Sequence, residues 1–323
     1  MKKILITGGA GFIGSCLHLY LKNKYKILII DKKKKLFLSK LDLLNKKKLE
    51  IFLKKEKPEL IIHLAAQSLV DETINKKKYY LNNIVATRNL VKCMKKNNLN
   101  NLIFSSTAAV YKDSNKKLSE NSKINLNSTY AKTKYECEKI IKNSKLNSII
   151  LRFFNVCSSL KINKKIVGEF HNPETHLIPT IVYKNLYKKK VYIYGNNYKT
   201  LDGSCVRDYV HIKDICSAID KSTSYLLNNI KKFEIINIGS SSQLTNLQIL
   251  KKIEKITKIK TNFQIVKNRI GDVDKLSCLI KKSKDKLNWE PKYSRIETII
   301  NDEIDWVKYL KKQKLIRKFK NYL

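Results

Sequence analysis

Short apolar runs alternate along the chain with longer stretches in which apolar residues recur at helical spacing. The apolar runs cover residues 4–6, 27–30, 60–64, 102–104 and 149–153. Continuous runs of this length are typical of strands buried on both faces of a parallel sheet, and the stretches between them are typical of amphipathic helices. The alternation predicts an α/β protein built on a Rossmann-type, doubly wound parallel sheet.

The first apolar run leads into a turn rich in glycine, and a helical pattern begins directly after it. Gly8, Gly11 and Gly14 stand at regular intervals, with Phe12 and Ile13 at the start of the expected helix. Gly8 allows a tight turn, Gly11 leaves room for a pyrophosphate, and Gly14 lets the helix pack closely on the sheet. Free N–H groups and the helix dipole favour an anion there. The pattern predicts that these residues bind a dinucleotide.

Further residues of the dinucleotide site are expected where the following strands end. Asp31 ends the second apolar run, and its carboxylate would bind the adenosine ribose and repel a 2′-phosphate, which favours NAD over NADP. The lysines of residues 32–35 argue weakly for NADP. Asp42 and Leu43 follow a short apolar patch and are expected to border the adenine. The next strand ends in the segment Leu64, Ala65 and Ala66, where small residues leave room for a ligand.

The formal net charge of +40 is the most unusual property of the composition. Of the 67 basic residues, only the six arginines are suited to specific forked contacts with phosphate. The lysines are spread over the whole chain and alternate with apolar residues, as on solvated helix faces. We therefore expect no specific nucleic-acid partner, and weak, salt-sensitive binding of polyanions as a by-product of the charge.

Cysteine usage and hydropathy indicate a cytoplasmic protein. The seven cysteines are scattered and form no C-x-x-C pair, which suits reduced thiols in a cytoplasmic enzyme. No apolar segment approaches the length that spans a bilayer, and the N-terminus enters the first strand without an apolar signal region. We expect neither export nor a membrane partner.

The length of 323 residues suits two domains. We expect a dinucleotide domain over residues 1–155, with a return segment near 208–240 in which residues 235–238 form another strand. A smaller α/β substrate domain would take residues 156–207 and 241–323. The active site would lie in the cleft between the two domains.

Candidate catalytic residues follow the run at residues 102–104. That strand ends in a hydroxyl-rich segment containing Thr107, and the next helix begins with Tyr130 and carries Lys134 one turn later on the same side. A nearby ammonium would lower the phenol pKa and make Tyr130 a usable proton acceptor. The same Tyr-x-x-x-Lys spacing occurs at Tyr20, Tyr135 and Tyr209, about as often as chance predicts. The place of Tyr130 in the expected fold therefore singles it out.

Together, the glycine triplet, Thr107, Tyr130 and Lys134 resemble the extended short-chain dehydrogenase/reductase family. Four later segments narrow the resemblance, namely residues 151–155 (LRFFN), 171–179 (HNPETHLIP) and 202–211 (DGSCVRDYVH), and Arg269 with Gly271 and Asp272. Over residues 1 to about 290 the chain is similar to the UDP-glucose 4-epimerases of that family.

The resemblance implies an isomerase of galactose metabolism that interconverts UDP-galactose and UDP-glucose. In that family scheme, Tyr130 takes the proton of the sugar 4-hydroxyl while C4 passes a hydride to tightly held NAD. Thr107 orients the hydroxyl, and Lys134 holds the nicotinamide ribose. The resulting 4-keto sugar turns over in the site and takes the hydride back on its other face.

The resemblance also implies the remaining binding residues and a homodimer. Asn83 and Phe153 join the residues above in binding NAD, as do Thr107, Tyr130 and Lys134. The UDP-sugar is expected to contact Thr107, Tyr130, Asn155, His176, Leu177, Arg207, Arg269 and Asp272. The two arginines carry the most weight because a guanidinium forks onto phosphate oxygens. The homodimer would pack through the helices around residues 79–96 and 130–143.

Some positions differ from the commonest family pattern, and other functions stay open. Thr107 replaces a frequent Ser, Phe153 a frequent Tyr, and Ser68 a Lys of some members. Leu276 has an intermediate bulk at a position that helps to decide whether N-acetylated sugars fit. The alternatives within the family are a nucleotide-sugar 4,6-dehydratase, which needs an Asp-Glu pair where this chain has Ala108-Ala109, and a decarboxylase. An alternative of another class is a non-catalytic protein that senses NAD or binds polyanions.

Overall fold

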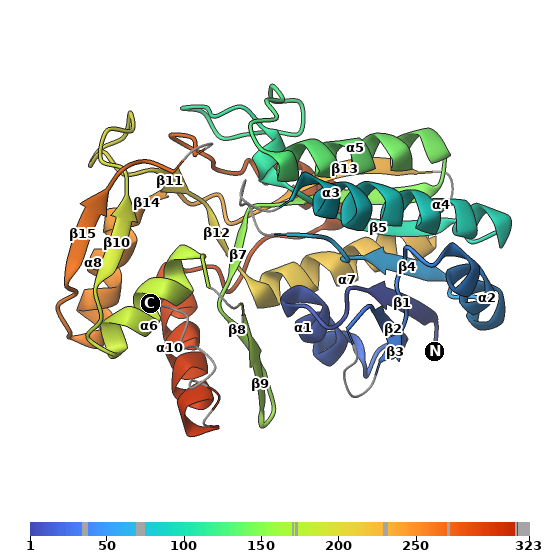
Figure 1. Cartoon of the computed structure of the whole chain (residues 1–323), viewed down its shortest axis with the longest axis horizontal. Coiled ribbons are helices and arrows are strands. Elements are labelled where there is room, and N and C mark those ends of the chain that lie inside the picture. Colours follow the sequence, from blue (N-terminus) through green and yellow to red (C-terminus); the bar gives the residue numbers. More distant parts are fainter. Residues whose placement is uncertain are drawn as a thin grey trace.

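The computed structural model describes residues 1–33, 38–68, 75–169, 171, 174–228, 232–269, 272–313 and 315. Within these residues, seven strands form one parallel sheet in the order β13-β6-β5-β4-β1-β2-β3 (Figure 1). The strands are β1 (Lys3–Thr7), β2 (Lys26–Asp31), β3 (Ser39–Lys40), β4 (Leu60–His63), β5 (Asn101–Thr107), β6 (Asn147–Phe153) and β13 (Phe233–Ile238). Each predicted apolar run coincides with one of them, so the predicted α/β fold with its parallel sheet is confirmed.

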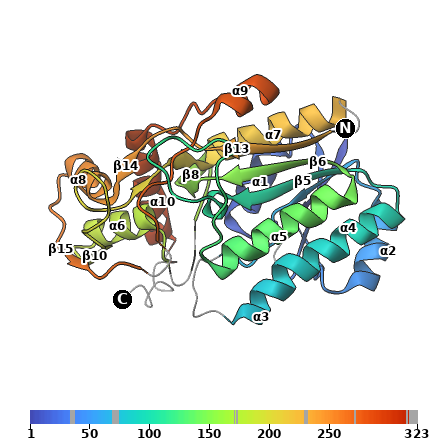
Figure 2. The same cartoon turned by 90° about the horizontal axis from the view of Figure 1, so that it is seen from above.

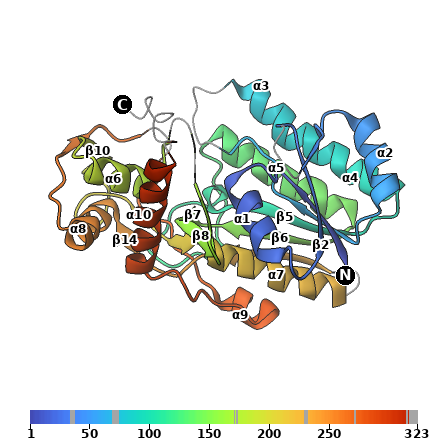
Figure 3. The same cartoon turned by 90° about the horizontal axis from the view of Figure 1, so that it is seen from below.

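Helices cover both faces of the sheet (Figures 2 and 3). α1 (Phe12–Leu21) and α7 (Ile212–Asn228) pack their apolar sides on one face. α2 (Lys46–Glu56), α4 (Ala86–Lys96) and α5 (Thr129–Ser144) cover the other. Since β1 lies between β4 and β2, the strand order reverses at β1, and ligands of such sheets bind beyond the carboxyl ends of the strands at that point.

The helix predicted over residues 79–96 is built from three consecutive pieces. α3 (Lys76–Tyr79) leads into a π-helical segment, η1 (Tyr80–Val85), which continues as α4. Apolar spacing does not reveal a π-helical segment this short. Its wider turns rotate the side chains only slightly relative to those of an α-helix. Such segments are frequent at functional sites, and Asn83 lies in this one.

The smaller part of the molecule lies beside the carboxyl ends of the strands (Figure 1). α6 (Leu177–Leu186), α8 (Asn246–Thr257) and α10 (Ile296–Lys312) share one apolar core. The strand pairs are β10 (Val191–Tyr194) with β15 (Phe263–Val266), and β11 (Val206–Arg207) with β14 (Leu244–Thr245).

The chain passes between the two parts at several places. β7 (Asn155–Cys157) pairs with β12 (Tyr209–His211), and β8 (Ser159–Ile162) forms a hairpin with β9 (Lys165–Gly168). α9 (Lys281–Leu287), although later than residue 241, packs on β13 and α7. The division into two domains with a boundary at residue 241 therefore stays a prediction. It assigns α9 to the substrate domain, although this helix packs on β13 and α7.

The sequence also predicted reduced cysteine thiols and no segment that spans a membrane. All seven cysteines are free and buried. None of the helices in the described part of the chain is both long enough and apolar enough to cross a bilayer.

Candidate functional site

The glycine loop at the end of β1 is shaped by close backbone packing. Gly8 has φ +74°, and a Cβ placed there would lie 2.6 Å from the backbone nitrogen of Ala65. A Cβ at Gly14 would lie 2.5 Å from the carbonyl oxygen of Gly8. At Gly11 the nearest atom would be 3.3 Å away, so this glycine is needed less for the fold than the other two.

Gly11 is also the N-cap of α1, and it has no side chain to cap the helix. The N–H groups of Phe12 and Ile13 therefore begin the helix without a side-chain acceptor at the cap, which is the arrangement that binds phosphate. Room at Gly11 and this helix N-terminus fit the pyrophosphate of NAD.

Asp31 braces the glycine loop from the end of β2. Its carboxylate accepts hydrogen bonds from the backbone N–H of Ala10 (3.0 Å) and from that of Lys33 (2.9 Å). The sequence indicated only a ribose contact for Asp31, and the bond to Ala10 adds a structural role. The ribose contact stays a prediction.

The segment after β4 lies against the glycine loop and is tied to the neighbouring helices. Leu64 donates its N–H to the carbonyl of Thr7 at 3.1 Å, and Ala65 packs where Gly8 lacks a Cβ. Asn83 is buried, accepts from the N–H of Gln67 at 2.7 Å and donates to Thr133 on α5 at 2.9 Å. Asn83 thus connects the β4 loop to α5. Ala66 is partly exposed, as a residue bordering a ligand would be.

The two residues expected at the adenine have different environments. Asp42 is exposed and accepts from the N–H of Leu44 at 2.9 Å. Leu43 is buried in the core beneath α2 and α4, and its carbonyl accepts from Asn89 at 3.0 Å. Only Asp42 therefore presents its side chain to solvent, and adenine contacts of both residues stay predictions.

Thr107 and Tyr130 meet at the carboxyl end of β5. Thr107 ends the strand, and its hydroxyl accepts from the N–H of Ala109 at 3.1 Å. Ser128 caps α5 by accepting from the N–H of Ala131 at 3.1 Å, which places Tyr130 in the first turn. The Tyr130 phenol lies near enough to the Thr107 hydroxyl for that hydroxyl to lower the phenol pKa. The structure thus brings the predicted hydroxyl and phenol together.

The expected effect of Lys134 on the Tyr130 pKa is wrong in this structure. Burial raises the pKa of Tyr130 to about 12, although the nearby Thr107 hydroxyl opposes the rise. The ammonium of Lys134 lies 4.1 Å from the ring centroid of Phe104 on β5, and burial lowers its own pKa to about 8. The reason is that one helical turn aligns the two Cα–Cβ bonds but does not fix where a long side chain ends. Loss of solvation then dominates both pKa values.

A buried ion pair between α5 and β6 was not foreseen from the sequence. Arg152 on β6 donates to both carboxylate oxygens of Glu138 on α5, at 2.9 and 2.6 Å, and to the Tyr111 hydroxyl at 2.9 Å. Both charged side chains are almost fully buried. The pair clamps α5 onto the sheet one turn after Lys134. A rare arginine inside an apolar strand was the available signal in the sequence.

His63 at the end of β4 is a second unforeseen residue. It is fully buried, and its ring nitrogens lie 2.7 Å from the Thr7 hydroxyl and 3.0 Å from the Thr87 hydroxyl. Burial and the Lys134 charge lower the pKa of His63 to about 3, so the imidazole is neutral. It holds β1, β4 and α4 together below the site.

Arg207, Asp272 and Arg269 lie close together in the smaller part of the molecule. Arg207 donates to the carbonyls of Val206 (2.9 Å) and Val273 (2.8 Å) and to the Asp272 carboxylate (3.1 Å). Arg269 is exposed, with its guanidinium carbon 4.0 Å from the ring centroid of Tyr194. Arg269 is thus open to a phosphate, whereas Arg207 would have to exchange its Asp272 contact for one.

The remaining predicted residues lie on three further elements. Asn155 begins β7 with an exposed side chain, and its N–H donates to the carbonyl of Asp208 at 3.0 Å. Phe153 is buried at the end of β6, in register with Thr107. His176 and Leu177 begin α6, and the imidazole of His176 contacts Glu174 rather than the arginines. Asn172, Pro173 and Gly271 of the family segments lie outside the described residues.

Known proteins share both the sequence and the fold. Residues 4–239 match the NAD dependent epimerase/dehydratase family. The UDP-glucose 4-epimerase of Lactobacillus helveticus is 32% identical over 95% of this chain and 97% of its own length. That of Rhizobium meliloti is 33% identical over 90% of this chain and 92% of its own length.

Among solved structures, the UDP-glucose 4-epimerase from Brucella ovis in complex with NAD superposes with a TM-score of 0.87. It is 28% identical, and the match covers 95% of this chain and 98% of that chain. The chain therefore belongs to the NAD dependent epimerase/dehydratase family and, within it, to the group of the UDP-glucose 4-epimerases.

Proposed function

We propose that this protein interconverts UDP-galactose and UDP-glucose as an NAD-dependent UDP-hexose 4-epimerase. The observation that carries the proposal is that the Thr107 hydroxyl and the Tyr130 phenol lie together at the sheet edge to which the glycine loop also belongs. A proton acceptor and a dinucleotide loop at one edge suit oxidation and reduction of a sugar hydroxyl.

The residues of this chain move the proton and hold the reactants. Tyr130 takes the proton of the sugar 4-hydroxyl and later returns it, and Thr107 orders the phenol and the hydroxyl by hydrogen bonds. The Lys134 ammonium lies over the Phe104 ring in this structure, and we propose that it holds the nicotinamide ribose when NAD is bound. NAD, held by the residues of the glycine loop, would supply a reversible hydride acceptor for C4 of the sugar.

Binding of the two ligands is proposed for the residues predicted from the sequence. The NAD residues are Gly8, Gly11, Phe12, Ile13, Gly14, Asp31, Asp42, Leu43, Leu64, Ala65, Ala66, Asn83, Thr107, Tyr130, Lys134 and Phe153. The UDP-sugar residues are Thr107, Tyr130, Asn155, His176, Leu177, Arg207, Arg269 and Asp272. Among the UDP residues, Arg269 has the strongest support because its guanidinium is exposed.

The proposal is tested by giving the purified protein UDP-galactose and measuring UDP-glucose, with UDP-N-acetylgalactosamine in parallel. We expect UDP-glucose, and activity on the N-acetylated sugar would show how the site around Leu276 tolerates bulk. A product lighter by one water would indicate a dehydratase, although the methyl groups of Ala108 and Ala109 cannot transfer the required proton. Binding of NAD and UDP-glucose without any turnover would indicate a sensing protein and refute the proposal.

We further propose a cytoplasmic homodimer that packs through residues 79–96 and 130–143. The support is that η1, α4 and α5 lie side by side on one outer face (Figure 2). Seven free, buried thiols suit a reducing compartment. Light scattering at working concentration should give twice the chain mass of 37.7 kDa, and a monomer mass would refute the dimer.

A further inference from the structure

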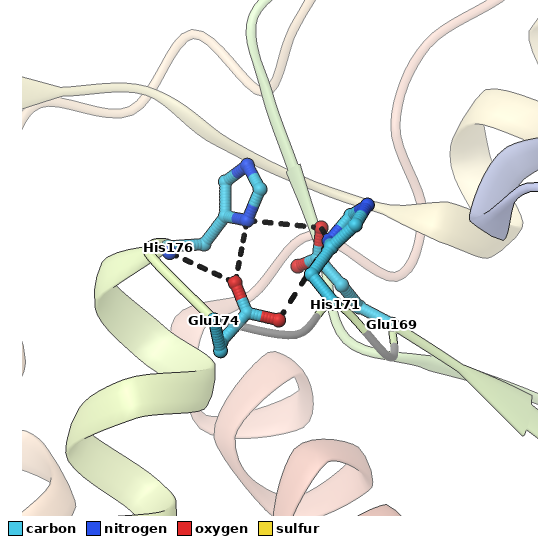
Figure 4. A group of neighbouring side chains, drawn as sticks. All are labelled: Glu169, His171, Glu174 and His176. Carbon is cyan, nitrogen blue, oxygen red and sulfur yellow. Dashed lines mark hydrogen bonds and ion pairs between the residues drawn. The ribbon is translucent and has the colours of Figure 1, made fainter. Parts of the chain in front are cut away.

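Two histidines and two glutamates converge between β9 and α6, and one of them, His176, is also among the residues proposed to bind the UDP-sugar. Figure 4 shows the side chains of Glu169, His171, Glu174 and His176 pointing toward one another at the start of α6. Each offers one ligand atom, and these four atoms lie within 4.8 Å of one another. All four residues come from one short stretch of chain, so the cluster forms locally.

The distances within the cluster are close to those of a tetrahedral metal site. His171 Nδ1 lies 3.0 Å from Glu169 Oε1 and 3.7 Å from Glu174 Oε2. His176 Nδ1 lies 3.1 Å from Glu169 Oε1 and 2.6 Å from Glu174 Oε1. Around zinc with bonds of about 2.0–2.1 Å, neighbouring ligand atoms are roughly 3.3–3.4 Å apart. Small side-chain movements would therefore convert this cluster into a coordination sphere.

The carboxylates are buried and retain unused acceptor atoms. The side chains of Glu169 and Glu174 are 3% and 2% exposed. Within the part of the chain that the structure describes, Glu169 Oε2, Glu174 Oε2 and the nearby Glu303 Oε2 on α10 have no hydrogen-bond partner. Buried carboxylate oxygens normally have partners, because desolvation is costly. A concentration of such oxygens favours a cation locally, although the net charge of +40 opposes one over the whole molecule.

The cluster is also held in place and open to solvent. Glu174 Oε1 accepts the N–H groups of Thr175 (3.0 Å) and His176 (2.9 Å), which fixes its carboxylate. The imidazoles of His171 and His176 are 30% and 44% exposed and offer a path of entry for an ion. Oriented ligands and an entry path are both requirements of a metal site.

From this geometry we propose that Glu169, His171, Glu174 and His176 bind one divalent transition-metal ion, for which zinc is the best match. Two imidazole nitrogens and two carboxylate oxygens suit zinc better than magnesium or calcium, which prefer oxygen ligands alone. Four protein ligands leave no open position, so the ion is structural and takes no part in the reaction. It fastens the chain after β9 to the first turn of α6, where Leu177 lies. The proposal does not depend on the epimerase activity.

The test uses the purified full chain after treatment with a chelator. Zinc or cobalt(II) is added, excess is removed, and bound metal is measured by mass spectrometry together with the cobalt absorption spectrum. The test variant is H171A/H176A, and the control is His18→Gln, which changes a histidine of α1 outside the cluster. Glu169→Gln is a second test variant that keeps the side-chain shape. Circular dichroism and NAD binding report whether each variant is folded.

We expect one metal ion per chain and a cobalt spectrum without a thiolate charge-transfer band, since all cysteines are buried elsewhere. Affinity should fall on the order of 100-fold or more in H171A/H176A, because loss of direct ligands exceeds the effect of an outer-shell change. It should stay unchanged in His18→Gln. Zinc should raise the melting temperature of the wild-type chain and of His18→Gln, but not that of H171A/H176A. Absence of stoichiometric metal, equal binding by folded H171A/H176A, or a thiolate band would overturn the proposal and leave a metal-free ion-pair cluster.

Discussion

At the scale of single residues, the environment of Tyr130 and Lys134 decides the chemistry. Both groups are desolvated, which raises the pKa of the phenol to about 12 and lowers that of the ammonium to about 8. Both shifts disfavour the charged form, although the proposed reaction needs a phenolate beside an ammonium. Burying these groups therefore lowers the stability of the folded protein. Mutations should separate their effects on activity from their effects on stability.

Replacement of Tyr130 by Phe should reduce turnover by about 10²-fold or more while leaving NAD binding intact, because it removes the proton acceptor and little else. Steady-state kinetics and a cofactor titration measure the two effects. Tyr135→Phe is the matched control, since Tyr135 lies on the same helix but packs in a different apolar cluster. Full activity of Tyr130→Phe would disprove the role of the phenol.

Replacement of Lys134 by Met should abolish activity but stabilise the cofactor-free protein at pH 7. A buried lysine whose pKa falls from 10.5 to about 8 costs the folded state roughly 3 kcal/mol wherever the group is charged in both states. Between these two pKa values the unfolded chain binds more protons than the folded one, so the stability of the wild type rises with pH. The gain from Lys134→Met should be full below pH 8 and vanish above about pH 10.5.

Urea unfolding at several pH values measures this gain. Lys132→Met is the control, because Lys132 is exposed on the same helix and should change stability by less than about 0.5 kcal/mol. An equal or larger gain at high pH would mean that packing, and not desolvation of the ammonium, explains the effect.

At the scale of elements, the β1–α1 connection combines two demands on its glycines. Gly8 and Gly14 are required by the backbone, since a Cβ at either would overlap main-chain atoms. Gly11 has nearly enough room for a Cβ and stands at the uncapped start of α1. The structure thus requires two glycines of this regular motif for folding, and we propose the third, Gly11, for the ligand.

Gly8→Ala should therefore destabilise the protein by at least about 2 kcal/mol, through the positive φ and the overlap with Ala65. Gly11→Ala should change stability by less than about 1 kcal/mol but weaken NAD binding at least about tenfold, because its methyl group occupies space for the phosphates. Thermal unfolding and cofactor titration separate the two cases. Unchanged NAD affinity of Gly11→Ala would argue against a phosphate at this helix start.

At the scale of the whole molecule, charge is the dominant property. The net charge of +40 arises from 67 basic and 27 acidic residues, so most lysines have no acidic partner available. Ion pairs such as those of Lys24 with Asp220 and Lys252 with Glu297 connect distant segments but are exposed and contribute little. Repulsion among the remaining lysines opposes the compact state.

Raising the salt concentration from about 0.01 M to about 0.15 M should therefore increase the melting temperature, because the Debye length falls from about 30 Å to about 8 Å. Calorimetry over a series of sodium chloride concentrations measures the effect. If screening causes the effect, the increase in melting temperature should level off at higher sodium chloride concentrations. A melting temperature that stays constant would mean that the lysines are too far apart to repel one another appreciably.

Much of the fold and part of the site could be predicted because their signals are local. Every apolar run became a strand of the sheet, since burial on both faces demands continuous apolar sequence. Thr107 and Tyr130 meet because each stands at the end of an element that the sheet aligns at one edge. Other features depend on side-chain reach and packing, which the spacing of residues in the sequence does not reveal. They are the bidentate pair of Arg152 and Glu138, the hydrogen bond from Ala10 to Asp31 and the π-helical turn.

By itself, the amino-acid sequence determined the alternating α/β architecture and the glycine turn after β1, because periodicity and glycine positions act within a few residues. It also singled out the phenol of Tyr130, whose catalytic role stays a prediction. Only the tertiary structure decided the charge state of that phenol, the partner of Lys134 and the convergence of Glu169, His171, Glu174 and His176. The physical reason is that solvation and coordination depend on everything that surrounds an atom in space. The surroundings of Tyr130 and Lys134 come from segments that are distant in the sequence, whereas the four residues of the cluster lie within one short stretch and meet because of how that stretch folds.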